Sequence, residues 1–191
     1  PYTAVGHPAV QAMVEATGVA LEVKPVMPMM MRSVPAPLPK QRWIVTDAAR
    51  EARAAGVPFG RMVDPFGEPV RRALSLWAWV REQGREMPFL TAYLRAAWAE
   101  GVDITSPAGL ARVLTDAGLD PAAATARFDD PASVALLDAH LEEMLEAGLW
   151  GVPSFRVSGG EGAAAPFACW GQDRIWRVAA EIVARAGGDP G

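Results

Sequence analysis

The order of strand and helix patterns is the feature that most restricts the fold of this 191-residue chain. Strand-like alternation occurs only near the two ends, over residues 19–27 and again at 154–157 and 166–170. Between these segments, apolar residues recur at helical spacing almost without interruption. Such a chain predicts an α/β domain that is interrupted by a large all-helical segment.

Prolines and glycines bound most of the helical patterns, as is typical of helix starts and stops. The patterns predict helices at residues 7–17, 40–55, 68–83, 89–99, 107–117, 121–128, 131–147 and 172–186, with Pro1 suited to the first turn of the first helix. The proline- and methionine-rich segment 27–39 predicts a loop. The glycine-rich residues 158–162 predict the turn of a C-terminal hairpin.

The predicted order is a helix and a strand at the start of the chain, and two strands and a helix at its end. This order lacks one strand of a known fold. A strand before Pro1 would give β-α-β, a helical insertion and β-β-α, which is a thioredoxin-like fold. Without that central strand the sheet would expose an unpaired edge, so we expect the natural polypeptide to extend upstream. We expect residues 1–28 and 148–191 to form the thioredoxin-like domain, and residues 29–147 to form the proline-rich loop and helical insertion.

Composition argues against several function classes. The formal net charge of −4 indicates no basic surface for a nucleic acid. The single cysteine, Cys169, rules out an intrachain disulfide, a CxxC redox pair and a four-thiolate zinc site, and we expect no metal. It fits a reducing compartment, so we expect a cytoplasmic protein. No apolar run has the length of a membrane span and no signal peptide is recognisable, so a membrane partner is not expected.

The segment Gly151-Val152-Pro153-Ser154-Phe155 leads directly into a predicted strand. The bond before Pro153 can be cis at low cost, which would turn the main-chain groups of Val152 outward. Those groups could then pair with an extended peptide in the manner of a strand. Alternatively, Pro153 simply starts an edge strand.

A second motif, Trp170-Gly171-Gln172-Asp173-Arg174, opens the last predicted helix. A helix N-terminus favours a carboxylate, and the side chain of Asp173 could hold an ammonium group. A γ-glutamyl group carries both charges on one carbon. The alternative is that Asp173 only completes a helix cap. Since the two motifs flank one hairpin, we expect them at the same end of the sheet.

These motifs together carry a family resemblance that covers essentially the whole chain. The sequence resembles the 2-hydroxychromene-2-carboxylate isomerase and kappa-class glutathione transferase group, within the DsbA-like thioredoxin superfamily. The matching residues are Pro1-Tyr2-Thr3 with His7-Pro8, Lys40 through Arg50 (KQRWIVTDAAR), Gly148 through Phe155 (GLWGVPSF) and Trp170 through Arg174 (WGQDR).

The resemblance implies that glutathione is the cofactor, with main-chain pairing at Val152, beside Pro153, and γ-glutamyl contacts from Gln172 and Asp173. The family's reactive serine would precede Pro1 and is not in this sequence, so no catalytic residue can be assigned. The family often carries an asparagine near the thiol where this chain has Met31. A homodimer and a small-molecule aromatic substrate are further implications.

Other candidate residues have more ordinary interpretations. His7 and His140 are expected to face solvent or cap helices, and Cys169 to be a buried apolar thiol. The tryptophans are expected mostly in the core, although Trp43, Trp77 and Trp79 could instead line an aromatic pocket. Arg32 and Lys40 are expected to be solvated charges that could attract an acidic substrate. The methionine-rich residues 27–31 could form an adaptable apolar wall or part of the core.

The function predicted from these observations is a glutathione-dependent isomerase that acts on an aromatic or conjugated electrophile. Two rival enzyme classes are a glutathione transferase and a DsbA-like thiol–disulfide oxidoreductase. The second would need a reactive cysteine upstream of Pro1, since the chain has no CxxC pair. A third possibility is a non-catalytic module that binds glutathione.

Overall fold

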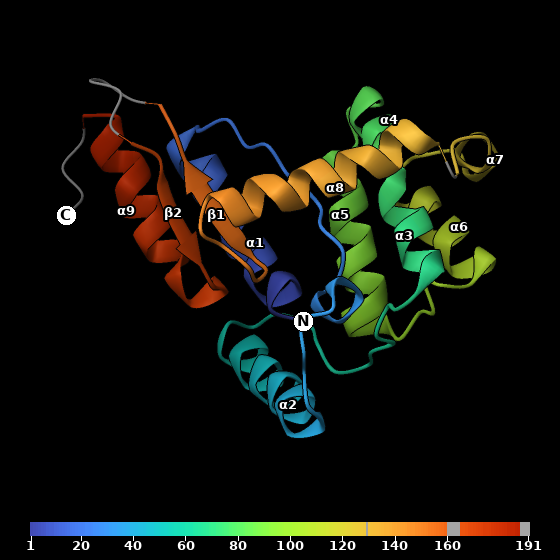
Figure 1. Ribbon diagram of the computed structural model, residues 1–191. Helices are drawn as coiled ribbons and strands as arrows, with labels where there is room; N and C mark the ends of the chain where they lie inside the picture. The colour runs from blue at the N-terminus through green and yellow to red at the C-terminus, as the bar shows by residue number, and fades with distance from the viewer. Residues whose placement is uncertain (129, 160–164, 188–191) are drawn as a thin grey trace. The chain divides into compact units, whose positions relative to one another are not determined.

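The computed structural model describes residues 1–128, 130–159 and 165–187, and most of them are helical (Figure 1). In chain order the elements are α1 (Tyr2–Thr17), the 3-10 turn η1 (Met29–Arg32), α2 (Leu38–Ala54), α3 (Glu68–Ser75), α4 (Trp77–Glu82), α5 (Glu86–Arg95), the π-helical turn η2 (Ala96–Glu100), α6 (Pro107–Asp116), α7 (Pro121–Thr125), α8 (Pro131–Glu146), β1 (Ser154–Val157), β2 (Phe167–Trp170), the 3-10 turn η3 (Gln172–Arg174) and α9 (Ile175–Arg185).

The chain divides into two compact units. Residues 2–22 and those from 142 onward form one of them, which we call the hairpin unit. Pro1 and residues 23–141 form the other, which we call the helical unit. The divisions lie at 22/23 and 141/142, whereas the predicted domain boundaries were 28/29 and 147/148. An α/β unit is therefore interrupted in sequence by an all-helical one.

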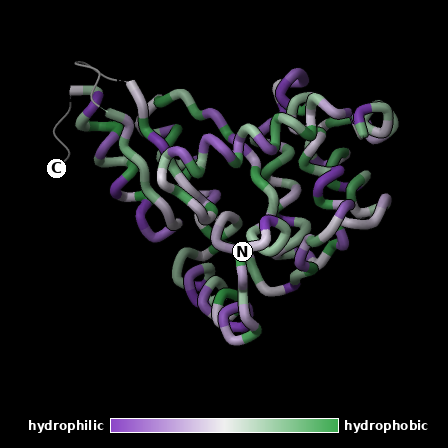
Figure 2. Tube along the Cα trace, in the orientation of Figure 1, coloured by the Kyte–Doolittle hydropathy of each residue, from purple (hydrophilic) through white to green (hydrophobic). Residues whose placement is uncertain are grey.

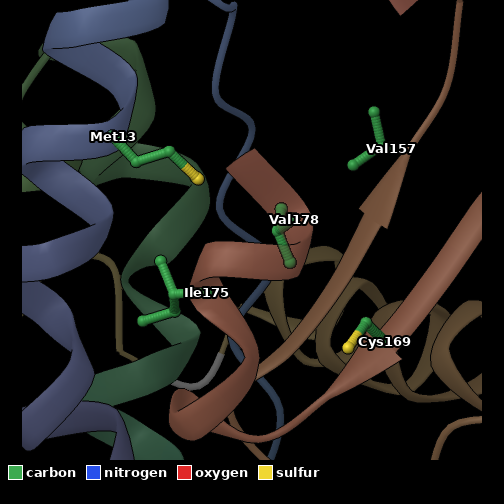
Figure 3. Close-up of a cluster of buried hydrophobic side chains, with 5 residues drawn as sticks. All are labelled: Met13, Val157, Cys169, Ile175 and Val178. Carbon is green, nitrogen blue, oxygen red and sulfur yellow. The ribbon is translucent and has the colours of Figure 1, made fainter. Parts of the chain in front are cut away.

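In the hairpin unit, β1 and β2 pair antiparallel, with Ser154 opposite Trp170 and Val157 opposite Phe167. Because side chains alternate along a strand, one face of the hairpin carries Phe155, Val157, Phe167 and Cys169. This face packs with α1 and α9 into an apolar core, to which Met13, Ile175 and Val178 contribute (Figure 3). Hydrophilic and hydrophobic residues interchange along α9, as expected of a helix with one buried face (Figure 2).

The helical unit has a core of its own. Its largest fully buried side chains include Trp77, Phe89, Leu76, Ile104 and Leu114. The rings of Trp77 and Phe89 lie 6.3 Å apart, and those of Phe89 and Tyr93 lie 6.0 Å apart. A smaller apolar cluster joins Met27, Val70 and Leu137, with Met31 and Leu74 packed against it.

The predicted strand over residues 19–27 is wrong. In the part of the chain that the structure describes, the sheet consists of β1 and β2, and residues 19–27 pair with neither. Alternating side chains favour a strand only where a neighbouring strand supplies hydrogen bonds, and among the described residues no strand pairs with this segment. The predicted loop 27–39 contains the 3-10 turn at Met29–Arg32.

Residues 68–83 form two helices where one was predicted. The break lies at Leu76, whose N–H donates to the carbonyl of Ala73, three residues back. The hydroxyl of Ser75 donates to the carbonyl of Arg72 at 2.8 Å, a back-bond that typically bends a helix. The other predicted helices are found with shifted ends, and part of the predicted hairpin turn, at 160–162, lies outside the described residues.

Candidate functional site

The hairpin brings the two sequence motifs together. The Gly171 N–H donates to the carbonyl oxygen of Pro153 at 3.0 Å, directly beyond the pair formed by Ser154 and Trp170. The residue before Pro153 and the residues after Gly171 therefore lie at one end of the hairpin. All the residues involved belong to the hairpin unit.

The peptide bond between Val152 and Pro153 is cis. Val152 is 39% exposed, and among the described residues its N–H and C=O have no hydrogen-bond partner. The adjoining chain is held in place, since the Ser154 hydroxyl donates to the carbonyl of Gly151 at 2.6 Å. Exposed main-chain groups on a fixed turn can pair with an extended peptide.

The start of the last helix holds two opposite charges close to Gly171. An Asp173 carboxylate oxygen lies 3.4 Å from Nη1 of Arg174, and both side chains are about half exposed. Gly171 has a φ of 106°, and a Cβ built on it would collide with the Asp173 carboxylate and lie 2.8 Å from Nη1 of Arg174. Glycine is therefore favoured by the backbone conformation, and a side chain at this position would displace the ends of the Asp173 and Arg174 side chains.

Asp173 does not cap this helix. Its only described hydrogen-bond or ion-pair partner is Arg174, and the Gly171 N–H is already occupied by Pro153. An acidic side chain in the first turn that is not used for capping remains available to an incoming ammonium group. The helix start itself favours an incoming carboxylate.

Helix α1 supports this end of the hairpin unit through Gly6. A Cβ built on Gly6 would lie 2.8 Å from Gln172 Cβ and 3.2 Å from Ile175 Cδ1. Only hydrogen fits between α1 and the turn that carries Gln172. Gly6 is therefore a positioning residue that the sequence patterns did not identify.

Two tryptophans border the cis bond and were also missed as a pair. The ring centroids of Trp150 and Trp170 lie 4.7 Å apart, although the residues are twenty positions apart in sequence. Gly151, between Trp150 and Val152, has no room for a side chain because the Trp170 indole lies against it. Trp170 and Arg174 belong to a motif that sequence inspection singled out, but nothing local indicated that Trp170 stacks.

The expectation that His7 and His140 face solvent or cap helices is wrong. They are 7% and 5% exposed, respectively. A ring nitrogen of His140 lies 3.1 Å from the carbonyl oxygen of Pro25, so burial is accompanied by a hydrogen bond. Burial lowers the pKa of His7, because a desolvated imidazolium is disfavoured. Both histidines lie on the buried faces of their helices. The identity of one polar residue does not indicate on which face of a helix it lies.

The other candidates have mainly structural roles. Cys169 is 9% exposed in the apolar core, as predicted. Trp77 and Trp79 are buried in the helical unit, whereas Trp43 is 58% exposed with the Arg50 guanidinium 5.3 Å from its ring.

Arg32 was expected to be a solvated charge, but its Nε donates to the carbonyl of Met27 at 2.9 Å and its exposure is intermediate. Lys40 is exposed. Met27 and Met31 contribute to the core, while Met30 is 44% exposed.

The described residues include neither a metal-binding cluster nor a helix that could cross a membrane. No three residues of the types His, Cys, Asp and Glu gather closely enough there to hold a metal ion. None of the described helices combines the length and the apolarity that crossing a membrane demands.

A hairpin that follows a cis-proline and leads into a packed terminal helix, in a chain interrupted by helices, defines a thioredoxin-like protein. The model of the DSBA-like thioredoxin domain family matches residues 1–183, so the chain belongs to that family. No curated protein matches the chain in sequence.

Solved structures with the same fold include two distant relatives. A 2-hydroxychromene-2-carboxylate isomerase (HCCA isomerase) superposes with a TM-score of 0.75 at 17% identity, over 95% of this chain and 89% of that one. A protein from Nitrosomonas europaea described as a "putative protein disulfide isomerase" superposes with a TM-score of 0.71 at 17% identity, over 98% and 94%. These matches support a thioredoxin-like α/β fold with a helical insertion.

Proposed function

We propose that this protein is a glutathione-dependent isomerase that acts on an aromatic or conjugated electrophile. The observation that supports it best is the junction at Pro153 and Gly171. There, one hydrogen bond joins an unpaired main-chain turn at Val152 to a helix start that carries Asp173. Glutathione needs both features, since it is a short extended peptide with a doubly charged γ-glutamyl end.

The residues present fit this cofactor. The N–H and C=O of Val152 would pair with its cysteinyl main chain, as in strand addition. The helix start would receive the γ-glutamyl carboxylate, Asp173 would receive the ammonium group, and the Gln172 amide would donate to the same carboxylate. When bound, glutathione would supply the thiolate nucleophile for a reversible isomerisation. The protein's own part is to bind and orient it with groups that the hairpin and α1 hold in place.

Calorimetry with reduced glutathione tests the binding mode. Asp173→Asn removes the negative charge at constant size, and we expect affinity to fall about tenfold, since hydrogen bonds between charged groups contribute about 1.5–3 kcal/mol and this carboxylate is half exposed. Glu15→Gln removes an exposed carboxylate of α1 and serves as the matched control. Glutaryl-cysteinylglycine, which lacks the ammonium group, should bind the wild-type protein and the Asp173→Asn protein with equal affinity.

Two results would overturn this assignment. One is full affinity for glutathione in the Asp173→Asn protein. The other is an equal loss in the Glu15→Gln protein, which would show a general charge effect. Turnover of an aromatic conjugated ketone or acid, with glutathione recovered unchanged, would then separate an isomerase from a transferase, which consumes it.

A thiol–disulfide oxidoreductase is the second candidate, because one structural relative is described as a putative protein disulfide isomerase. The chain's only cysteine is buried, so this chemistry would need a cysteine outside the given sequence. An insulin-reduction assay on the natural full-length protein distinguishes the two: rapid reduction would favour the oxidoreductase.

A further inference from the structure

Asp64 lies in the loop between α2 and α3, and this loop is fixed against the end of the helical run formed by α5 and η2. The last carbonyl groups of a helix have no partner within it. Here the carbonyls of Ala97 and Trp98 accept from the N–H groups of Val63 and Gly60, at 2.9 and 3.0 Å respectively. Asp64 follows Val63 directly, so the anchored backbone holds it beside this helical run.

Tyr93, one helical turn before Ala97 in α5, is influenced by the Asp64 carboxylate. Tyr93 is 7% exposed, and its ring lies against Phe89 at a centroid distance of 6.0 Å. Burial raises the pKa of Tyr93 because a desolvated phenolate is disfavoured, and the negative charge of Asp64 raises this pKa further. The hydroxyl of Tyr93 therefore stays neutral and lies within electrostatic reach of Asp64.

The Tyr93 hydroxyl has no hydrogen-bond partner among the described residues. In the same part of the chain, the fully enclosed side-chain polar atom that lacks a partner is Nε1 of Trp77. The Tyr93 hydroxyl is not enclosed in this way, so it retains some contact with solvent. Since buried polar groups are normally hydrogen-bonded, a shielded hydroxyl without a partner is available to a ligand.

The Asp64 carboxylate likewise has no hydrogen bond or ion pair with any described residue. The residue is exposed, yet desolvation raises the pKa of its carboxyl group, so one side of the group is screened from water. The positive charge of the Pro1 ammonium group partly opposes this rise in pKa. Asp64 is thus an accessible carboxylate that makes no ion pair, next to a neutral hydroxyl.

We propose that Asp64 and Tyr93 form a binding site for an amine ligand in its protonated, ammonium form. The ammonium group would donate to the Asp64 carboxylate and to the Tyr93 hydroxyl oxygen, since both can accept. Charge-assisted hydrogen bonds of this kind are stronger than neutral ones, so an alcohol would bind more weakly, and Asp64 would repel a carboxylate. The site lies within the helical unit and does not depend on the proposed function.

An NMR titration with benzylamine, with benzyl alcohol as its neutral counterpart, tests this site in the absence of glutathione. At pH 8 an alkylammonium group is charged. Burial lowers the pKa of a free Pro1 amine to about 6, so at pH 8 this amine is neutral and does not compete for Asp64. We expect the wild-type protein to bind benzylammonium about tenfold more tightly than benzyl alcohol.

Substitutions at constant size separate the two groups. Asp64→Asn should lower the affinity for benzylammonium about tenfold, and Tyr93→Phe should lower it about fivefold, because the first removes a charged acceptor and the second a neutral one. Asp138→Asn removes an exposed carboxylate of α8 in the same unit, and as the matched control it should leave both affinities unchanged. Asp64→Glu keeps the charge and should bind benzylammonium more tightly than Asp64→Asn does.

Equal binding of benzylammonium and benzyl alcohol by the wild-type protein would overturn the proposal, as would equal losses in the Asp64→Asn and Asp138→Asn proteins. Thermal denaturation of each variant is measured in parallel. A Tyr93→Phe protein with a lower Tm but an unchanged ratio of the two affinities would show that Tyr93 only packs, and this would also overturn the site. Glutathione is titrated separately, so loss of either ligand tests its own site alone.

Discussion

The substitution Gly6→Ala tests the packing that positions the candidate site. Gly6 lies inside α1, and the new methyl group would be 2.8 Å from Gln172 Cβ and 3.2 Å from Ile175 Cδ1. Ordinary contacts between carbon atoms begin near 3.5 Å. Helix α1 or the turn that carries Gln172 must therefore move by several tenths of an ångström.

Two opposing effects determine the change in stability. Alanine in a helix interior is favoured over glycine by about 0.5–1 kcal/mol. Overpacking of a well-packed contact costs about 1–3 kcal/mol. The second effect is larger, so the free energy of unfolding should fall by about 1–2 kcal/mol. For a chain of this size, that corresponds to a decrease in Tm of about 3–6 °C.

Chemical denaturation followed by circular dichroism measures this difference. Ala9→Gly, at an exposed position of the same helix, reports the propensity effect alone. Gln172→Gly removes the nearer of the two atoms that the new methyl group would meet, so a double-mutant cycle with Gly6→Ala should give a coupling energy of about 1 kcal/mol or more. A Gly6→Ala protein that is as stable as the wild type, with no coupling, would refute the close approach of α1 to the turn.

Further variants test other parts of the hairpin unit. Burial lowers the pKa of His7, so just below pH 6.5 the unfolded state binds more protons than the folded state. The free energy of unfolding should therefore fall as the pH drops through that value. His7→Gln should flatten this pH dependence in denaturation curves measured between pH 5 and 8. Cys169→Ser should destabilise the core by about 1–3 kcal/mol yet leave glutathione affinity unchanged, and lost affinity would contradict its structural role. Arg185→Ala removes bonds from α9 to the carbonyls of both described ends of the hairpin loop and should lower Tm. Gly171→Ala should weaken glutathione binding more than the control substitution Gly148→Ala does. Gly148 also has a positive φ, but a Cβ added there would meet no atom within 4 Å.

Local signals made the hairpin and its flanking motifs predictable. A proline followed by alternating apolar residues indicates the start of a strand. A glycine followed by an acidic residue indicates the start of a helix. Each pattern is complete within a few residues. The strand limits at Ser154 and Val157 were predicted correctly for this reason. The strand at residues 19–27 was not, because its existence depends on a partner that a local pattern cannot supply.

Residues whose roles arise from tertiary contacts could not be predicted in the same way. Gly6 resembles an ordinary weak point in a helix until Gln172 is found against it. Trp150 and Trp170 meet only because the hairpin folds back, and the burial of His140 depends on a carbonyl 115 positions away. Hydrophobic periodicity is a local pattern, so it cannot predict contacts between residues that are far apart in sequence.

The hairpin register links the core to the candidate site. Phe155 and Cys169 form the pair that faces the core, and Ser154 and Trp170 form the next pair, on the opposite face. A slip of one residue would exchange the two faces, burying Trp170 and exposing apolar core side chains. The free energy of core packing therefore also keeps Trp170 on the outer face and Gly171 bonded to Pro153. For this reason, conservative substitutions that keep the core apolar should alter stability much more than ligand affinity.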